Sequence, residues 1–383
     1  MARQRGLSDQ RPEFVSASEA AAILGVRTAT IYAYASRGLL GGSSQGPGRK
    51  ARYSRALVET LRVKAAARAG HAAVAAAALR WGEPVLDSAI TRLTPRGPVY
   101  RGHRAIDLVG STFESVAELL WQRRADWSAL APRVKSRGAR PSLHTLLSIM
   151  AQLALSRPDT PTAVIRRLAC ASGKFEALAE KQPTIAGALG ASLRGAVLAL
   201  EDRQLVDAAL VLIADHELNA STFAARVATS AGTRWPEAFI AAIATATGVR
   251  HAAACDGAER VWKMPVSRAK ARLGQGAVLE GFEAGAYPDG DPRGDRLVSL
   301  VRPRLTARDD ARLTELLSAA HDEGMFPSVD LGLVLLCHAL RFPPGSASLV
   351  FVIGRTAGWL AHVEEQAASG DPIRPRARAI SRG

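Results

Sequence analysis

The sequence has few of the residues that build disulfide frameworks, metal modules and aromatic-rich sheets. Three cysteines occur in 383 residues, Cys170, Cys255 and Cys337, and none stands at the spacing of a paired metal-ligand motif. We therefore expect a protein of a reducing compartment, without a disulfide framework and without a bound metal. Aromatic residues make up only 5% of the chain, and alternation of apolar with polar residues is rare, which disfavours a sheet-based fold.

Long hydrophobic runs are also missing. Nowhere do 18 consecutive apolar residues occur, and the arginines of residues 1–6 are followed by no apolar stretch. The sequence therefore predicts neither a membrane span nor a signal peptide, and a cytoplasmic location is the default expectation.

Positive charge is abundant and unevenly placed. Residues 1–80 hold 13 Lys and Arg against four Asp and Glu, a net charge of +9, whereas the other 303 residues contribute only +6. This asymmetry predicts an acidic partner for the N-terminal segment. On charge alone, a surface of solvated arginines is the alternative.

Apolar residues three and four apart in long Ala-, Leu- and Arg-rich segments predict an all-α protein. We expect a small winged helix-turn-helix domain at residues 1–62 and an alanine-rich helical connector at residues 63–83. Glycine and proline are dense between residues 274 and 294, which predicts a loop-rich stretch there.

Two short helices joined by a glycine turn are predicted near the N-terminus. Ser16 is expected to cap the first helix with Glu19 completing a capping box, and the second helix should run from Arg27 to Gly38. In a helix-turn-helix the start of the second helix faces base edges, and a basic wing would contact phosphates. The residues expected to contact DNA are Arg27, Thr28, Thr30, Arg37, Arg49, Lys50 and Arg52.

The segment from Ser16 to Val58 resembles the MerR-type winged helix-turn-helix, with Arg52-Tyr53 and Leu57-Val58 at the matching places. The resemblance implies a dimer on pseudo-palindromic double-stranded DNA, with an affinity that falls steeply with salt. A helix pair that docks another protein is the alternative.

Four separated segments of the remaining chain resemble the citrate synthase family, in the family's order. They are Tyr100–Trp121, Asp215–Val227, Gly354–His362 and Ile373–Arg376. The resemblance implies a citrate-synthase-like two-domain helical fold, with a large domain at residues 84–250 and 336–383 and a small domain at residues 251–335. It also implies a homodimer whose cleft closes on substrate.

The resemblance assigns roles to individual residues. His251 would hold the enol oxygen of an acyl-CoA, Asp330 would abstract its proton, and His216 would contact oxaloacetate or a similar dicarboxylate. Three arginines would bind the carboxylates, the last of them in the partner subunit's site: Arg293, Arg355 and Arg374. Acyl-CoA would be a substrate or ligand, and no permanently bound cofactor is expected.

One departure from the family pattern bears on catalysis. Ala284 stands where the family carries the histidine that polarises the ketone and protonates the alkoxide, and Glu283 replaces a glycine. Losing a general acid typically lowers a rate by about 100- to 10,000-fold. His321 and His338 flank Asp330 in the sequence, but their spacing does not support a replacement role.

Three functions remain open at this point. The favoured one is a metabolite-linked regulator that binds oxaloacetate- and acyl-CoA-type ligands, condenses them poorly and binds DNA. The second is an active citrate or 2-methylcitrate synthase, an acyltransferase of the tricarboxylic acid cycle or its relatives. The third is a scaffold that pairs with an intact paralogous subunit and lends Arg374 to that subunit's site.

Overall fold

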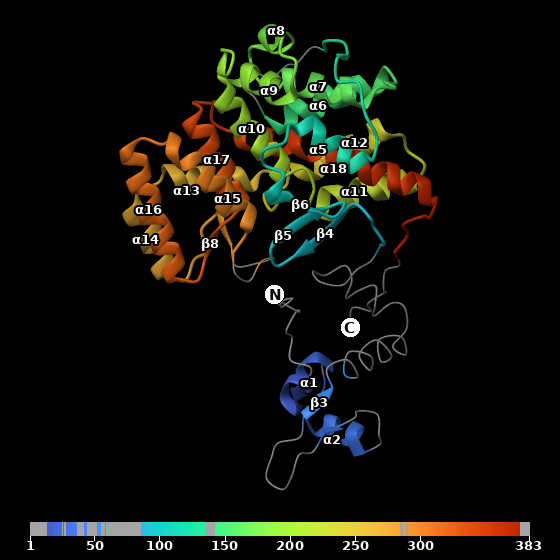
Figure 1. Ribbon diagram of the computed structural model, residues 1–383, viewed down its shortest axis with the longest axis vertical. Helices are drawn as coiled ribbons and strands as arrows, with labels where there is room; N and C mark the ends of the chain where they lie inside the picture. Colours follow the sequence, from blue (N-terminus) through green and yellow to red (C-terminus); the bar gives the residue numbers. More distant parts are fainter. Residues whose placement is uncertain are drawn as a thin grey trace, which may run out of the picture. The chain divides into compact units, whose positions relative to one another are not determined.

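The computed structural model contains two compact units, one formed by residues 1–87 and 374–383 and the other by residues 88–373 (Figure 1). The residues that the structure describes are 14–24, 26, 28–36, 42–43, 52–54, 58, 86–134, 142–283, 287 and 290–375. Within these ranges, no helix combines the length and the apolar character needed to cross a membrane.

The N-terminal unit is a helix pair with a small antiparallel sheet. Its elements are β1 (Phe14–Ser16), α1 (Ala17–Leu24), α2 (Thr28–Ser36), β2 (Gly42–Ser43) and β3 (Arg52–Ser54). Strand β3 lies between β1 and β2. The predicted capping box is confirmed, because the Glu19 amide donates to Ser16 Oγ at 3.2 Å and the Ser16 amide donates to Glu19 Oε2 at 2.7 Å.

A small apolar core holds the helix pair against the sheet. Ile31 of α2 and Tyr53 of β3 are buried together with Val15, Ala20 and Val58. The predicted connector, residues 63–83, lies outside the described residues.

The second unit is mainly helical, with two small sheets among its described residues. Its strands are β4 (Thr91–Thr94), β5 (Gly97–Tyr100), β6 (His103–Arg104), β7 (Phe282–Glu283) and β8 (Phe326–Pro327). Strands β4, β5 and β6 form one antiparallel sheet, and β7 pairs with β8. The predicted loop-rich stretch corresponds to the region between helices α14 and α15, where β7 is the element described.

The helices of this unit are arranged around one long helix, α18. They are α5 (Phe113–Trp121), α6 (Leu143–Leu155), α7 (Pro161–Cys170), α8 (Glu176–Ala179), α9 (Ile185–Arg194), α10 (Leu200–Leu212), α11 (Ala220–Ser230), α12 (Trp235–Ala246), α13 (Ala254–Lys263), α14 (Val266–Gly274), α15 (Pro292–Val301), α16 (Ala307–Asp322), α17 (Val329–Ala339) and α18 (Ser346–Ser369), with short 3₁₀ turns at Ala105–Asp107 and Arg302–Arg304. Helix α18 is buried along most of its length and packs on α5, α10, α11, α12 and α17, while α14 and α16 lie together at one edge (Figure 1).

Helix starts in this unit are fixed by side-chain caps. Oxygen atoms of Ser, Thr, Asp or Asn accept a backbone N–H in the first turns of α5, α6, α9, α11, α15, α16 and α17. Each such cap stabilises a helix by about 1 kcal/mol. Two of the caps, Asp291 of α15 and Ser328 of α17, lie immediately before residues of the candidate site.

Two glycines of α18 allow the chain after α10 to approach the helix backbone. A Cβ on Gly354 would lie 2.6 Å from Ile213 Cγ1, and a Cβ on Gly358 would lie 2.3 Å from Asp215 Oδ1. The Gly358 amide donates to the Ala214 carbonyl at 2.9 Å. This contact fixes the segment that leads into His216.

Candidate active site

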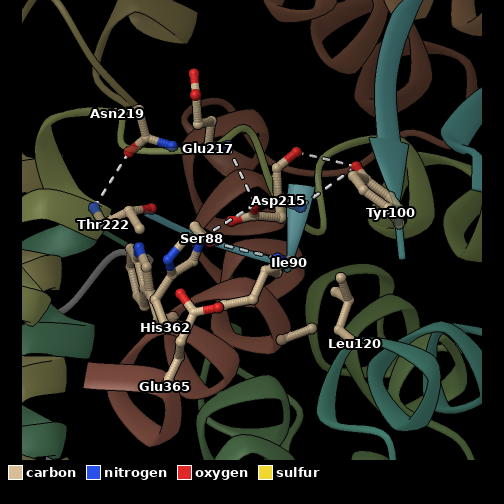
Figure 2. A network of polar contacts seen from close by, with 12 residues as sticks. Ser88, Ile90, Tyr100, Leu120, Asp215, Glu217, Asn219, Thr222, His362 and Glu365 are labelled. Atoms are coloured by element: carbon tan, nitrogen blue, oxygen red, sulfur yellow. Dashed lines mark hydrogen bonds and ion pairs between the residues drawn. The ribbon is translucent and has the colours of Figure 1, made fainter. Parts of the chain in front are cut away.

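The loop that carries His216 is anchored by the buried carboxylate of Asp215 (Figure 2). Asp215 Oδ2 accepts the Glu217 amide at 3.0 Å and faces His362 Nε2 at 3.3 Å. The Tyr100 hydroxyl donates to the Asp215 carbonyl at 3.0 Å, which ties the loop to β5. Burial acts to raise the pKa of Asp215, but His362 and Arg355 outweigh it and lower that pKa below its usual value.

His362 connects Asp215 to helix α11. Its Nδ1 faces Arg226 Nη1 at 3.3 Å, and a guanidinium can only donate, so Nδ1 accepts and the proton sits on Nε2. Arg226 also donates to Gln366 Oε1 at 3.0 Å and pairs with Glu365. The buried chain from Arg226 through His362 to Asp215 holds α11, α18 and the His216 loop in one arrangement.

His216 is partly exposed, and its Nε2 lies 2.7 Å from the Tyr287 hydroxyl. Burial lowers its pKa well below the usual value, and the charges of Arg293 and Arg355 lower it further. His216 is therefore neutral at physiological pH. The influence of both arginines on one imidazole also shows that these three predicted residues lie near one another.

His251 lies just before α13, and its ring meets the ring of Phe351 edge-on at 5.4 Å. Burial, assisted by the charge of Arg355, lowers its pKa to about 4, so this imidazole is neutral as well. Its Nε2 is 2.6 Å from Ser221 Oγ, the hydroxyl in the first turn of α11.

The partners of Ser221 determine where His251 carries its proton. Ser221 donates its single hydroxyl proton to Asn219 Oδ1 at 2.8 Å, an oxygen that is oriented by the Thr222 amide. The indole of Trp359 donates to the same Ser221 oxygen at 3.1 Å. Ser221 can therefore only accept from His251, which places the imidazole proton on Nε2 and leaves Nδ1 as an acceptor.

Arg293 is buried at the start of α15 and pairs with its own helix cap. Its Nε and Nη2 donate to the two oxygens of Asp291 at 3.0 and 2.9 Å. Asp291 also accepts the Val329 amide at 3.3 Å, which joins the starts of α15 and α17. Nε and Nη2 of the guanidinium are thus occupied by Asp291. Nη1 is the nitrogen that can donate to a ligand.

Arg355 is buried in the middle of α18, with only 2% of its surface exposed. Its Nε donates to the Ile213 carbonyl at 2.7 Å, and the guanidinium lies 4.6 Å from the Phe351 ring centre. Among the described residues, neither terminal nitrogen has a hydrogen-bond partner. Burial lowers the pKa of Arg355 to about 10; Asp215 opposes that effect, and Arg293 reinforces it.

Asp330 is partly exposed in the first turn of α17. Cys255 donates to its Oδ1 at 3.2 Å, and the Ser328 hydroxyl lies 3.4 Å from its Oδ2. Burial raises the pKa of Asp330, while the thiol and the charge of Arg293 partly offset the rise. A carboxylate with a raised pKa is a stronger base than an exposed aspartate, which suits proton abstraction.

The structure brings together five of the six residues predicted for ligand chemistry: His216, His251, Arg293, Arg355 and Asp330. Arg374 is exposed and lies beyond residues 88–373, so its predicted place in a partner subunit's site stays a prediction. Ala284 lies outside the described residues. His321 and His338 are exposed, and His338 pairs with Asp309 at 3.1 Å, outside this cluster.

Sequence reasoning missed three members of the cluster, Tyr287, Ser221 and Cys255. Ser221 stands inside the family-like segment Asp215–Val227, and Tyr287 stands three positions after Ala284 in the glycine- and proline-rich stretch of residues 274–294. Cys255 carried no signal, because its contact with Asp330 joins residues 75 positions apart.

The residues predicted to contact DNA are only partly described. Thr28 is exposed at the first position of α2, Thr30 is partly buried in the same turn, and Arg52 is exposed on β3. Arg27, Arg37, Arg49 and Lys50 lie outside the described residues.

The described residues thus bring two neutral histidines, two buried arginines and one partly exposed carboxylate together in a helical fold. A family model described as the C-terminal domain of citrate synthase matches residues 161–376, more than half of the chain. The chain belongs to the citrate synthase family. A second model, described as a helix-turn-helix domain, matches residues 14–62; the narrower MerR-type resemblance is not confirmed by it.

Curated relatives carry the names of two activities. The chain is 33% identical over 184 residues to a citrate synthase of Haloferax volcanii, covering 45% of this chain and 48% of that one. It is 29% identical over 185 residues to a 2-methylcitrate synthase of Shewanella oneidensis, covering 45% and 49%. The chain thus spans about half the length of the curated relatives it matches.

Solved structures match over more of the chain. Citrate synthase from Thermotoga maritima gives a TM-score of 0.68 at 19% identity, covering 79% of this chain and 94% of that one. A citrate synthase of Thermoplasma acidophilum, in a ternary complex with carboxymethyl coenzyme A and oxaloacetate, gives a TM-score of 0.68 at 18% identity, covering 78% of this chain and 94% of that one. At these identities the likeness establishes the helical fold.

Proposed function

We propose that residues 88–373 bind a 2-oxo dicarboxylate of the oxaloacetate type together with an acyl-CoA and condense them poorly. The helix-turn-helix unit would make the protein a metabolite-linked regulator that binds double-stranded DNA. The observation that carries the proposal is the buried guanidinium of Arg355, whose two terminal nitrogens have no hydrogen-bond partner among the described residues. A buried charge of this kind is costly unless an anion meets it.

The two neutral histidines support a ligand that carries an uncharged polar group between its two carboxylates. Both imidazoles lie below their usual pKa because of burial, so neither adds a full charge to the site. A ketone oxygen, which needs a donor and no counter-charge, fits such surroundings.

The tautomer of His251 supports slow condensation. Because Ser221 accepts the proton of His251 Nε2, Nδ1 has a lone pair and no proton. An enol oxygen placed at Nδ1 would therefore receive no hydrogen bond from it. Exchanging the tautomer requires Ser221 to turn its own proton away from Asn219. Together with Ala284 in the sequence position described above, this favours ligand binding over rapid turnover.

An active citrate or 2-methylcitrate synthase is the second candidate. The observation in its favour is Asp330, whose raised pKa and contact with Cys255 suit a base for a thioester α-proton. Relatives named for both activities support the same alternative.

The release of free CoA separates the two candidates. Purified protein given oxaloacetate and acetyl-CoA or propionyl-CoA should release thiol far more slowly than a typical enzyme, whose turnover is about 10 per second. Isothermal titration should nevertheless detect oxaloacetate binding. Turnover at ordinary enzyme rates would reject the regulator, and absence of binding would reject both candidates.

DNA binding and assembly need separate measurements. Fluorescence anisotropy with the protein's own upstream duplex should give binding that weakens steeply with salt, with and without oxaloacetate. Regulation requires the ligand to change that affinity. Light scattering should give the mass of a homodimer, the state expected for both the fold and the DNA-binding unit.

A further inference from the structure

The C-terminal halves of helices α13 and α17 enclose a cavity of about 390 Å³, and the segment that leads into α18 completes its wall. This volume lies within the range of small-molecule sites, roughly 300–1,000 Å³. None of the described candidate-site residues lines the cavity. Its lining is mainly apolar and aromatic: Trp262, Val334, Cys337, Phe342, Pro343 and Ala347.

Trp262 contributes an indole that is held in one orientation. Only 4% of the residue is exposed, the Arg312 guanidinium lies 5.2 Å from the ring centre, and the His338 ring meets it edge-on at 5.4 Å. The indole Nε1 donates to no acceptor in the described part of the chain. A buried tryptophan N–H usually has an acceptor, so this one is available to a ligand in the cavity.

Arg341 lines the cavity from a strained backbone position. It follows the end of α17 with a φ of +56°, a left-handed conformation that glycine adopts at lower cost. The Phe342 amide donates to the Cys337 carbonyl at 2.8 Å, which fixes this turn. The Arg341 side chain is exposed and has no hydrogen bond or ion pair with any described residue. Strained backbone positions cluster at sites that bind ligands.

The remaining charged groups of the lining are paired. Glu259, the one acid of the described lining, forms an ion pair with Lys263. His338 Nε2 lies 3.1 Å from Asp309 Oδ2. Arg341 is therefore the basic residue of this lining that has no acidic partner, and it gives an otherwise apolar cavity one cationic end.

We propose that this cavity binds a monocarboxylate with a compact apolar body, an aromatic or branched aliphatic acid. The body packs against Trp262, Val334 and Phe342, and the carboxylate accepts hydrogen bonds from Arg341 and from the Trp262 indole. A guanidinium binds a carboxylate with two parallel hydrogen bonds, while the apolar walls disfavour the second charge of a dicarboxylate. The site depends neither on the proposed 2-oxo dicarboxylate nor on DNA.

The cavity lies along the same helix pair that carries the proposed base. Helices α13 and α17 pack side by side (Figure 1). Asp330 and Cys255, in contact at 3.2 Å, stand four positions before Val334 and Glu259 of the lining. Residues four apart lie on one face of a helix, so the cavity continues the seam that begins at the base. The bound acid lies beyond the reacting groups and is not a substrate of that site.

The test follows the indole N–H signals of the full-length protein, labelled with ¹⁵N at its six tryptophans, during a titration with benzoate. A carboxylate that accepts from an indole moves its proton signal downfield. We expect one signal to move saturably, the signal that is missing in Trp262→Phe. Benzamide, which has the same ring without the charge, should bind at least about tenfold more weakly, because a hydrogen bond to a charged group contributes that factor or more.

Arg341→Gly removes the guanidinium and relieves the positive φ, so its urea midpoint should equal or exceed that of the wild type. It should raise the dissociation constant of benzoate by about tenfold or more and leave that of benzamide unchanged. Arg157→Gly, the same change at another exposed arginine with a φ of +50°, is the matched control and should bind benzoate as the wild type does.

Three outcomes would overturn the proposal. They are a benzoate affinity unchanged in Arg341→Gly, movement of a different indole signal, and the lack of any saturable shift at millimolar benzoate. Each of them leaves oxaloacetate binding and DNA binding to their own measurements.

Discussion

The thiol of Cys255 donates a hydrogen bond to Asp330 Oδ1 at an S···O distance of 3.2 Å. The bond favours the charged carboxylate, so it opposes the rise in the pKa of Asp330 that burial causes. A cysteine that no spacing pattern singled out thus tunes the group proposed as the base.

Cys255→Ala should therefore raise the pKa of Asp330 further. The base works only when it is deprotonated, so the rate of proton exchange at the acetyl-CoA methyl group in D₂O should fall as pH drops through that pKa. Losing a hydrogen bond of about 1 kcal/mol moves the acid limb of the profile upward by roughly 0.7 pH unit. Cys170→Ala, a buried thiol in α7, is the control, and an unmoved profile in Cys255→Ala would contradict the tuning.

Arg355→Lys should weaken oxaloacetate binding while keeping a positive charge. Lysine cannot present the planar fork that binds a carboxylate with two hydrogen bonds. We expect the dissociation constant to rise by about 30-fold or more, since such a change costs roughly 2 kcal/mol or more. Isothermal titration measures it, with the exposed Arg234→Lys as control; equal affinities would remove Arg355 from the ligand site.

Ala284→His should accelerate condensation. The histidine would restore a proton donor at the sequence position where the family carries one, and general acids contribute about 100- to 10,000-fold. We expect at least a tenfold gain in thiol release, a conservative fraction of that range. Ala286→His is the matched control. No gain would mean that the neighbourhood of Glu283 or His251 has diverged as well.

Gly358→Ala should destabilise the second unit without touching a ligand. The added Cβ would lie 2.3 Å from Asp215 Oδ1 and 2.5 Å from the Ala214 carbonyl oxygen, so the backbone must move. Overpacking of this kind costs about 1–3 kcal/mol. Urea unfolding measures the change, and Gly110→Ala, where an added Cβ meets nothing within 4 Å, should stay within about 0.5 kcal/mol of the wild type.

Arg49→Ala combined with Arg52→Ala should weaken DNA binding and flatten its salt dependence. Each lost phosphate contact lowers the slope of log affinity against log salt by about one, so the pair should lower it by about two. Removing the exposed charges Arg96 and Lys174 from the other unit changes the net charge equally and should have less effect. Equal slopes in both double variants would favour the protein-docking alternative for the helix pair.

Sequence patterns over a few residues predicted the features that depend on interactions between residues close together in the chain. The capping box at Ser16 and Glu19 depends on residues three apart, and the structure contains it. The all-helical class followed from periodicity in the same way. The division of the second unit into large and small domains rested on the family resemblance and remains a prediction.

The site could be predicted only where the resemblance named a residue. His216 and Arg355 lie 139 positions apart, and only packing of the loop after α10 on α18 brings them together. Ser221, Cys255 and Tyr287 act through partners far away in the sequence, so no spacing rule could reveal them. The tautomer of His251 depends on Ser221 and Trp359, which are 30 and 138 positions from the residues they contact, so no sequence pattern could reveal it.

The lowered pKa of Arg355 has a consequence for the amount of protein in the cell, if the proposed ligand binds. Two buried guanidinium groups disfavour each other, and part of the folding free energy is lost in keeping both charged. The dianion proposed to bind between them would return that energy and would stabilise only the folded chain. The supply of one metabolite would then set how long the protein survives proteolysis in the cell, and scarcity alone could remove it.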